Sequence, residues 1–340
     1  MPKILFDAYT PPDIQLYESI SNELKKHGFE IEFVIPNNEE CINLIKKKGF
    51  PYKIVGSRSN KSFISKGVFN IIRFVLMFKY IYRTNPTVVI SRAISTPIAA
   101  KIAGKKVFMF IDNDAATLAL LLTLPLADRI YMPEAIKIYG NISPHIEKKV
   151  YFYRGIEEQI YLSEELKENI YKELNLEKNK DIIVVRPFGL ITEYETSGRD
   201  SLEEILKDLV FDEQIINKYH IIVLPRTVEQ KTLYEKIFKN GIIIPKTPLD
   251  GQSLLIQSKI FIGAGGTMSR EAWILGNTVF SFYKGKELSV EKWLKSQKNY
   301  YYGVISKTKI LKEKHKKNFF INTKLRSHIV KDIIENIIPH

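Results

Sequence analysis

A glycine-rich turn lies between two apolar segments in the last third of the sequence. The segment SKIFI is followed directly by GAGGTMSREAWILGN, residues 263–277. Gly265 and Gly266 let the backbone approach a ligand closely, and Thr267 adds a hydroxyl group. A helix starting near Met268 would direct free N–H groups and the positive end of its dipole to the same place, which suits a diphosphate. Glu271, one turn further on, is then placed to accept hydrogen bonds from ribose hydroxyls.

Two arginines follow apolar strands in the same half of the chain. Arg186 ends the run IIVVR and Arg226 ends IIVLPR. The carboxyl ends of parallel strands share one edge of a sheet, so both guanidinium groups are expected to face the phosphates held by the glycine turn. The segment IIIPK at 242–246 would offer backbone groups to a nucleobase. Two structural alternatives stay open, namely surface ion pairs for the arginines and a plain strand-to-helix turn for the glycines.

Positioning these residues requires parallel sheets, and the chain has the pattern for two. Short runs rich in Ile, Val and Phe alternate with helical patterns, which predicts sheets covered on both faces. The length of 340 residues exceeds what one hydrophobic core supports. We therefore predict an α/β protein with two doubly wound Rossmann-like domains facing a cleft. Their expected bounds are 1–150 and 151–320, with YFYRGIEEQIYL as the connector and a helix in 321–340 that packs across the domains.

Composition and charge exclude several classes of protein. The net charge is +13, which favours an anionic partner such as a phosphorylated small molecule. Nucleic acid is not expected, because no RNA-binding aromatic motif, zinc-finger spacing or basic tail is present. The single cysteine, Cys41, excludes an internal disulfide framework and has no evident catalytic partner. The six histidines show no metal-ligand spacing, so neither a metal nor a cofactor is predicted. No secretory signal is seen, so a cytoplasmic location is expected.

A long amphipathic helix is predicted at about 67–83, and two interpretations of it stay open. Its wide apolar surface is edged by Lys66, Arg73, Lys79 and Arg83. Such a helix can lie on an anionic membrane, here at the inner face, as a peripheral contact. It can equally be buried against the sheet with one basic edge exposed.

The second half of the chain resembles the donor-nucleotide domain of GT-B glycosyltransferases. The stretch GAGGTMSREAWILGN is similar to the diphosphate- and ribose-binding segment of the MurG-like N-acetylglucosaminyltransferases and the UDP-N-acetylglucosamine 2-epimerases. The whole chain resembles DUF354, a family found largely in archaea, in KILFD, YRGIEEQIYL, VVRP, LPR and IGAGGTMSREA. The resemblance implies that Gly265, Gly266 and Thr267 contact the diphosphate and that Glu271 contacts the ribose.

The resemblance also directs attention to acidic residues in the first half. Family members tend to have a histidine in the loop after the first strand, and Asp13 stands there in this sequence. Asp13 is predicted either to act as the general base for an acceptor hydroxyl or to cap the following helix. Asp112, at another strand end, is the second candidate. The sequence Asp112-Asn113-Asp114 matches the metal-binding DxD motif of GT-A enzymes, but GT-B members generally hold the diphosphate without metal.

These observations predict a metal-independent glycosyltransferase. The expected donor is a nucleotide-diphosphate sugar, of the UDP-sugar type, and a lipid-linked acceptor is compatible with the amphipathic helix. Two alternatives are a 2-epimerase acting on a UDP-sugar and a non-catalytic protein that binds nucleotide sugars.

Overall fold

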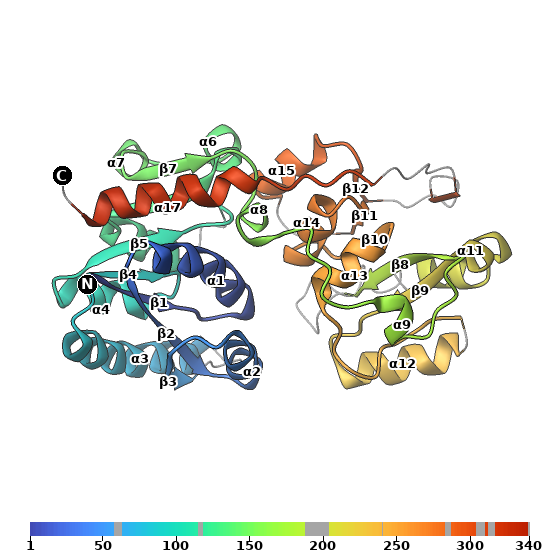
Figure 1. Ribbon diagram of the computed structural model, residues 1–340, viewed down its shortest axis with the longest axis horizontal. Helices are drawn as coiled ribbons and strands as arrows, with labels where there is room; N and C mark the ends of the chain where they lie inside the picture. The colour runs from blue at the N-terminus through green and yellow to red at the C-terminus, as the bar shows by residue number, and fades with distance from the viewer. Residues whose placement is uncertain are drawn as a thin grey trace. The chain divides into compact units, whose positions relative to one another are not determined.

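The computed structural model describes residues 1–57, 63–114, 118–187, 204–239, 241–282, 287–303, 310–311 and 317–338. The chain divides into two compact units (Figure 1). Unit 1 contains residues 1–161, 288–292 and 322–340, and unit 2 contains residues 162–287 and 293–321.

Unit 1 is built on a seven-stranded parallel sheet. The strands in their spatial order are β3 (Tyr52–Ser57), β2 (Glu30–Asn37), β1 (Lys3–Asp7), β4 (Val88–Ser91), β5 (Lys106–Phe110), β6 (Arg129–Pro133) and β7 (Val150–Tyr153). The order reverses between β1 and β4, which pair in parallel with Phe6 opposite Ile90. In open α/β sheets the point of reversal is where ligands bind, beyond the carboxyl ends of the strands.

Helices cover both faces of this sheet because side chains alternate along each strand. Ile4 and Phe6 contribute to one core, whereas Leu5 contributes to the other. The helices of unit 1 are α1 (Pro11–Lys26), α2 (Glu39–Lys48), α3 (Phe63–Thr84), α4 (Ser95–Ile102), α5 (Leu118–Thr123), α6 (Glu134–Tyr139), α7 (Pro144–Glu147), α8 (Glu158–Tyr161) and α17 (Thr323–Ile337), with the 3-10 turn η1 (Leu124–Leu126).

The carboxyl-terminal helix α17 is part of unit 1. It packs beside α1 and α8 and buries Leu325, Ile329 and Ile333 in the same core as β1 (Figure 1). The carboxylate of Asp332 accepts hydrogen bonds from Arg129 Nε at 2.8 Å and from the Tyr131 hydroxyl at 2.9 Å. These bonds attach the last helix to β6.

Unit 2 has a five-stranded parallel sheet. Its strands in spatial order are β12 (Tyr300–Tyr302), β11 (Thr278–Ser281), β10 (Ile260–Gly263), β8 (Asp181–Arg186) and β9 (Tyr219–Val223). An isolated parallel bridge from Ile222 to Ile243 adds one more position beyond β9. The order therefore reverses between β8 and β10, as it does between β1 and β4. Unit 2 also contains α9 (Ile170–Glu173), α11 (Glu213–Lys218), α12 (Val228–Phe238), α13 (Gly251–Gln257) and α14 (Thr267–Ile274). Helix α15 (Ser289–Lys295) begins in unit 1 and ends in unit 2.

The predicted fold class is confirmed, with two local differences. The residues interpreted as a connector include a strand, β7, which pairs with β6 at the edge of the first sheet. Four residues are too few for periodicity to distinguish a strand from a connector. The strand expected in GIIIP is present only as the bridge at Ile243. Among the described residues, no helix has both the length and the hydropathy that crossing a bilayer requires.

Candidate functional site

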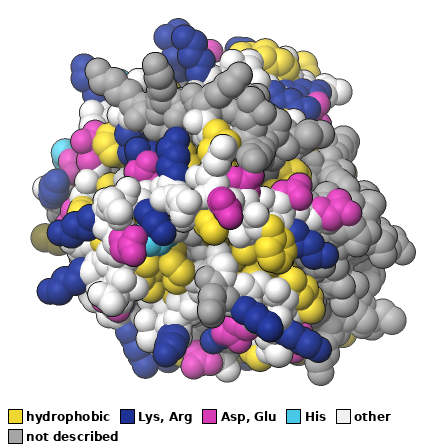
Figure 2. Space-filling view, turned by 90° about the vertical axis from the view of Figure 1, so that its right-hand side faces the viewer, with side chains coloured by type: hydrophobic (Ala, Val, Ile, Leu, Met, Phe, Trp, Pro, Cys, Tyr) yellow, Lys and Arg dark blue, Asp and Glu magenta, His cyan; other side chains and the backbone are white. Residues whose placement is uncertain are grey.

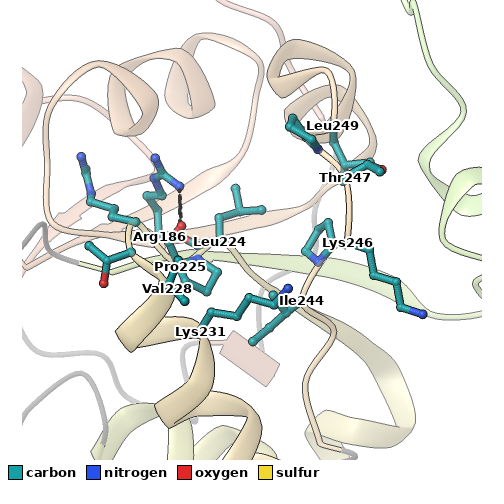
Figure 3. Close-up of a pocket in the computed structure, with 13 residues that line it drawn as sticks. Arg186, Leu224, Pro225, Val228, Lys231, Ile244, Lys246, Thr247 and Leu249 are labelled. Carbon is teal, nitrogen blue, oxygen red and sulfur yellow. Dashed lines mark hydrogen bonds between the residues drawn. The ribbon is translucent and has the colours of Figure 1, made fainter. Parts of the chain in front are cut away.

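A pocket of about 490 Å³ lies at the carboxyl edge of the sheet in unit 2 (Figure 3). Three segments line it: the end of β8 at Arg186, residues 224–228 with Lys231, and residues 244–249. The first segment is the end of β8, the second follows β9, and the third follows the bridge at Ile243. Figure 3 shows Lys246 and Thr247 across the pocket from Arg186. Parallel pairing brings together residues up to 63 positions apart in the chain.

The pocket is cationic. Its charged lining residues are Arg186, Arg226, Lys231 and Lys246, and none of the described lining residues is Asp or Glu. Lys231 Nζ lies 4.0 Å from Glu235 Oε1, outside the lining. Burial lowers the pKa of the Arg226 guanidinium, and no carboxylate among the described residues forms an ion pair with it. A partly buried guanidinium without a carboxylate indicates a site that favours an anionic ligand.

Backbone carbonyl groups hold the two arginines in place. Arg186 Nη1 donates to the carbonyl oxygens of Leu224 at 3.0 Å and Pro225 at 3.4 Å, and Arg226 Nε donates to the carbonyl oxygen of Pro187 at 3.0 Å. Each side chain thus reaches across to the segment that carries the other. The Arg226 guanidinium has further N–H groups, which a planar fork can present to a phosphate.

The amino terminus of α12 adds to the positive potential. The N-cap residue Thr227 accepts a hydrogen bond from Gln230 N at 3.2 Å, and the Gln230 side chain accepts one from Arg226 N at 2.8 Å. Thr227 and Val228 both line the pocket. The helix therefore begins at the pocket wall, where the positive end of its dipole lies.

The glycine turn lies next to the pocket, one strand along the sheet. Gly263 of β10 pairs in register with Arg186 of β8. Gly265 and Gly266 have φ of +81° and +79°, a region that L side chains rarely adopt, and α14 begins at Thr267. The parallel pairing therefore brings Arg186 to the predicted turn. None of Gly265, Gly266, Thr267 and Glu271 lines the 490 Å³ pocket itself.

Unit 1 has a second cluster, in which three carboxylates surround Arg92. Nε of Arg92 lies 3.4 Å from Asp13 Oδ1, and Nη1 lies 3.7 Å from Asp112 Oδ1. Nη2 of Arg92 also donates to the carboxylate of Glu157. Arg92 follows β4, Asp13 follows β1 and Asp112 follows β5, so the cluster lies at the carboxyl edge and spans the point of reversal.

Asp13 takes part in capping helix α1 and also forms an ion pair with Arg92. Its Oδ2 atom accepts hydrogen bonds from Tyr9 N at 3.1 Å, Thr10 N at 2.8 Å and Thr10 Oγ1 at 2.8 Å. Thr10 is the N-cap of α1, so Asp13 is the third residue of the helix and completes a capping box. Both oxygens of Asp13 are therefore engaged, and the side chain is only 5% exposed.

Burial raises the pKa of the acidic groups in this cluster. The pKa of Glu157 rises to about 8, because desolvation outweighs the attraction of Arg92. Desolvation also raises the pKa of Asp13, again against the effect of Arg92. Asp112 is the most accessible of the three carboxylates, with 31% of its side chain exposed. The buried hydroxyls of Tyr17 and Tyr153 have no hydrogen-bond partner among the described residues.

Sequence analysis found the glycine turn and both arginines of unit 2 but missed several neighbours. Arg92 directly follows β4, much as Arg186 ends β8, so its position after TVVIS was an available signal. Glu157 lies in the segment interpreted as a connector. Lys231 had no distinguishing pattern, because surface lysines are common. Lys246 ends the segment IIIPK, for which only backbone groups were proposed as contacts. Among the described residues, no group of three or more His, Cys, Asp or Glu side chains is arranged to hold a metal ion.

Comparisons with known proteins give one family and one fold. The family model described as "Protein of unknown function (DUF354)" matches residues 3–336. An uncharacterised protein of Methanocaldococcus jannaschii is 28% identical over 297 residues, covering 86% of this chain and 84% of its own.

Among solved structures, M. jannaschii UDP-GlcNAc 2-epimerase in complex with UDP-GlcNAc and UDP superposes with a TM-score of 0.69 at 15% identity. That match covers 98% of this chain and 99% of the epimerase. Acinetobacter baumannii MurG superposes with a TM-score of 0.61 at 10% identity, covering 98% of this chain and all of MurG. At these identities the likeness shows the fold, which is GT-B.

Proposed function

The chain belongs to the DUF354 family and has the GT-B fold, and from that premise we propose that it is an enzyme acting on a nucleotide-diphosphate sugar. The donor we propose is a UDP-sugar, and the reaction is glycosyl transfer without a metal ion. The acceptor is a hydroxyl compound, and a lipid-linked one is compatible with the membrane contact argued below.

The cationic pocket of unit 2 is the observation that supports this proposal. Four Lys and Arg side chains line it, with no carboxylate among the described lining residues, and it lies beside a glycine turn at the point where the sheet order reverses. We propose that Arg186 and Arg226 bind the diphosphate together with Gly265, Gly266 and Thr267. Glu271 would accept hydrogen bonds from the ribose, and residues 244–249 would contact the base.

A ligand panel tests the binding step directly. UDP, UDP-GlcNAc, uridine and inorganic phosphate are each added, and the midpoint of thermal unfolding is measured. UDP at about 100 times its Kd should add about 2.7 kcal/mol to the free energy of unfolding. Uridine, which lacks the diphosphate, should stabilise the protein much less. If neither UDP nor UDP-GlcNAc shifts the transition, the proposed donor is wrong.

We propose that the carboxylates around Arg92 carry the acid and base chemistry. Asp112 is the most accessible and is the better candidate for the base that takes a proton from the acceptor hydroxyl. Asp13 stays a candidate, although three hydrogen bonds and an ion pair engage it. Glu157, with a pKa of about 8, is largely protonated at neutral pH and is suited to donate a proton.

One observation favours epimerisation as a second candidate. Inverting a carbon that bears hydrogen requires a proton to be removed from one face and returned to the other, which suits a site with several carboxyl groups. Three lie around Arg92, and two of them have raised pKa values.

Incubation with UDP-GlcNAc alone separates the candidates by NMR of the products. A 2-epimer supports epimerisation, slow hydrolysis supports transfer, and binding without turnover identifies a binding protein. If Asp112 is the base, Asp112→Asn should lower turnover about 10²–10⁴-fold with little effect on nucleotide affinity.

A further inference from the structure

The net positive charge of the protein comes from one segment, which contains no acidic residues. Residues 41–111 contain 14 Lys and Arg residues and no Asp or Glu. The rest of the chain has 37 Lys and Arg residues against 38 Asp and Glu, so this segment accounts for the net charge of +13. On the face drawn in Figure 2, by contrast, acidic and basic side chains are interspersed.

The longest helix of this segment, α3, presents an apolar surface to solvent. One side of α3 is buried against β3 and α4 through Met77 and Ile81. The opposite side exposes Val68, Phe69, Ile71, Ile72, Val75 and Leu76, of which Ile71 is 66% and Ile72 is 50% exposed. We call these six residues the α3 face. Sequence analysis weighed a buried helix with one exposed basic edge, but the outward side is apolar from Val68 to Leu76.

The one charged residue within this stretch is turned inward. Arg73 is 1% exposed and donates to Asp7 Oδ1 at 2.5 Å and to Thr96 Oγ1 at 3.0 Å. Ser91 also donates to Asp7, at 2.8 Å, so the arginine is held in a buried polar network beneath the helix. Arg73 therefore lies within the apolar segment of the helix, but its side chain is not part of the α3 face.

Cations lie at the carboxyl-terminal end of the same helix. Lys79 and Arg83 are exposed one and two turns beyond Leu76, and Tyr82 is 73% exposed beside them. Lys53 is exposed on β3, on the same side of the strand as Val55, which packs against α3. None of these three cations forms an ion pair among the described residues. An apolar helix side followed by cations and an aromatic residue has the composition of helices that lie in a membrane interface.

We propose that the α3 face docks this protein on a bilayer that contains anionic lipids. Apolar side chains would enter the acyl boundary, and Lys53, Lys79 and Arg83 would lie at the lipid headgroups. A second copy of the chain is a poorer partner, because a twofold contact would bring two acid-free, positively charged segments together. Nucleic acid does not suit an apolar surface. The proposal does not depend on the identity of the sugar donor.

Flotation with vesicles tests the proposal on the full chain. The probe is a vesicle of phosphatidylcholine with 30% phosphatidylglycerol, and vesicles of phosphatidylcholine alone are the comparison. We expect the wild type to bind the anionic vesicles at least tenfold more tightly than the neutral ones, and added salt to weaken binding. Failure to float with anionic vesicles would overturn the proposal.

Two paired variants locate the contact. Ile71→Ser with Ile72→Ser should weaken binding at least tenfold, whereas Ile138→Ser with Phe211→Ser, which removes two exposed apolar side chains elsewhere, should not. Lys79→Gln with Arg83→Gln should remove most of the preference for anionic lipid. Its control, Lys324→Gln with Lys331→Gln on α17, makes the same change of charge and should keep that preference. Equal effects of the test and control pairs would contradict the assignment.

A spectroscopic readout keeps the test valid if the paired variants fail to fold. Val75→Cys is labelled with a polarity-sensitive dye, because the native Cys41 is buried and poorly accessible to the label. Anionic vesicles should shift the emission to the blue, and the label on Ile138→Cys should not respond. If neither label responds and light scattering instead shows a dimer that Ile71→Ser dissociates, the occupant of the α3 face is a second copy and the membrane proposal is wrong.

Discussion

Arg92 carries one positive charge among three carboxylates, and this imbalance determines the chemistry of the cluster. Asp13, Asp112 and Glu157 all lie within 3.7 Å of its guanidinium. Asp13 and Glu157 are buried, and one shared cation does not offset the desolvation of both anions beside Asp112, so at least one carboxyl group is expected to hold its proton near neutral pH. The raised pKa of Glu157 identifies it as that group.

The pKa of Glu157 leads to a stability prediction. Its value of about 8 lies above the ordinary 4.5, so the folded state binds more protons than the unfolded state between these two pH values. The free energy of unfolding should therefore fall as pH rises through this window. Relative to Glu157→Gln, which cannot ionise, the wild type should lose on the order of 3 kcal/mol between pH 5 and pH 8. Urea titrations at several pH values measure the difference.

A matched control separates this effect from general changes with pH. Glu335 lies on α17 with about half of its side chain exposed, and Glu335→Gln should give a curve parallel to that of the wild type. If the Glu157→Gln curve is also parallel to the wild type, Glu157 is already ionised in the folded protein and is not the proton donor.

In unit 2 the guanidinium of Arg226 is partly buried and forms no ion pair with a carboxylate in the part of the chain that the structure describes. Arg226→Lys should weaken UDP binding by about 1.5–3 kcal/mol, because the charge is retained but the planar fork is lost. Isothermal titration calorimetry measures the affinity. Arg154→Lys, at a side chain that is 91% exposed, is the control and should bind UDP like the wild type. Equal affinity for the Arg226 variant would remove this residue from the phosphate site.

At the scale of elements, strand register and strand order determine which residues meet. Parallel pairing of β8 with β10 places Arg186 opposite Gly263, although the two are 77 residues apart. Pairing of β1 with β4 similarly brings Asp13 and Arg92 to one edge. Arg186 and the glycine turn in unit 2, and Asp13 and Arg92 in unit 1, thus lie where the order of strands reverses.

The glycine turn gives a prediction at this scale. Gly266 has φ of +79°, and a Cβ atom there would meet no heavy atom within 4 Å. Its ψ of −169° places it in a region that is nearly restricted to glycine, so Gly266→Ala should destabilise the fold through backbone strain alone, by about 1–3 kcal/mol. If the turn holds the diphosphate, UDP affinity should fall as well. Denaturant titration and calorimetry measure the two effects.

Gly251→Ala is the control for this substitution. Gly251 begins α13, has no positive φ and also has open space around its Cβ position. Alanine there should be neutral or stabilise the protein by up to about 1 kcal/mol. If both variants have the same stability, the left-handed conformation at Gly266 is not a source of strain.

At the scale of the whole molecule, the two units have different roles in the proposed function. Unit 2 has the cationic pocket, whereas unit 1 has the carboxylate cluster and the acid-free segment. Hydrogen exchange with UDP should therefore protect amides in 224–231, 244–249 and 263–271, where the nucleotide binds. Uridine, the control, should protect residues 244–249 more than 263–271, because it has no diphosphate. Protection by UDP confined to unit 1 would contradict the assignment of the pocket.

The sequence alone predicted the elements and the class of fold. Alternating apolar and helical patterns are local properties, so the parallel sheets, the carboxyl-terminal helix and the turn before α14 followed from short windows of residues. Arg186 and Arg226 could be proposed because parallel strands end at a common edge. The short strand β7 was not predicted, because four residues are too few to show the periodicity of a strand.

The partners of each candidate residue depended on the tertiary structure. Sequence left Asp13 as either a base or a cap, and the structure engages it in a capping box and an ion pair with Arg92, which is 79 residues away. The tertiary structure also places Arg73 in a buried hydrogen-bond network and leaves the apolar side of α3 exposed to solvent. Such contacts depend on strand order and on which side of a helix meets the sheet. Long-range packing decides both, and local sequence patterns do not encode that packing.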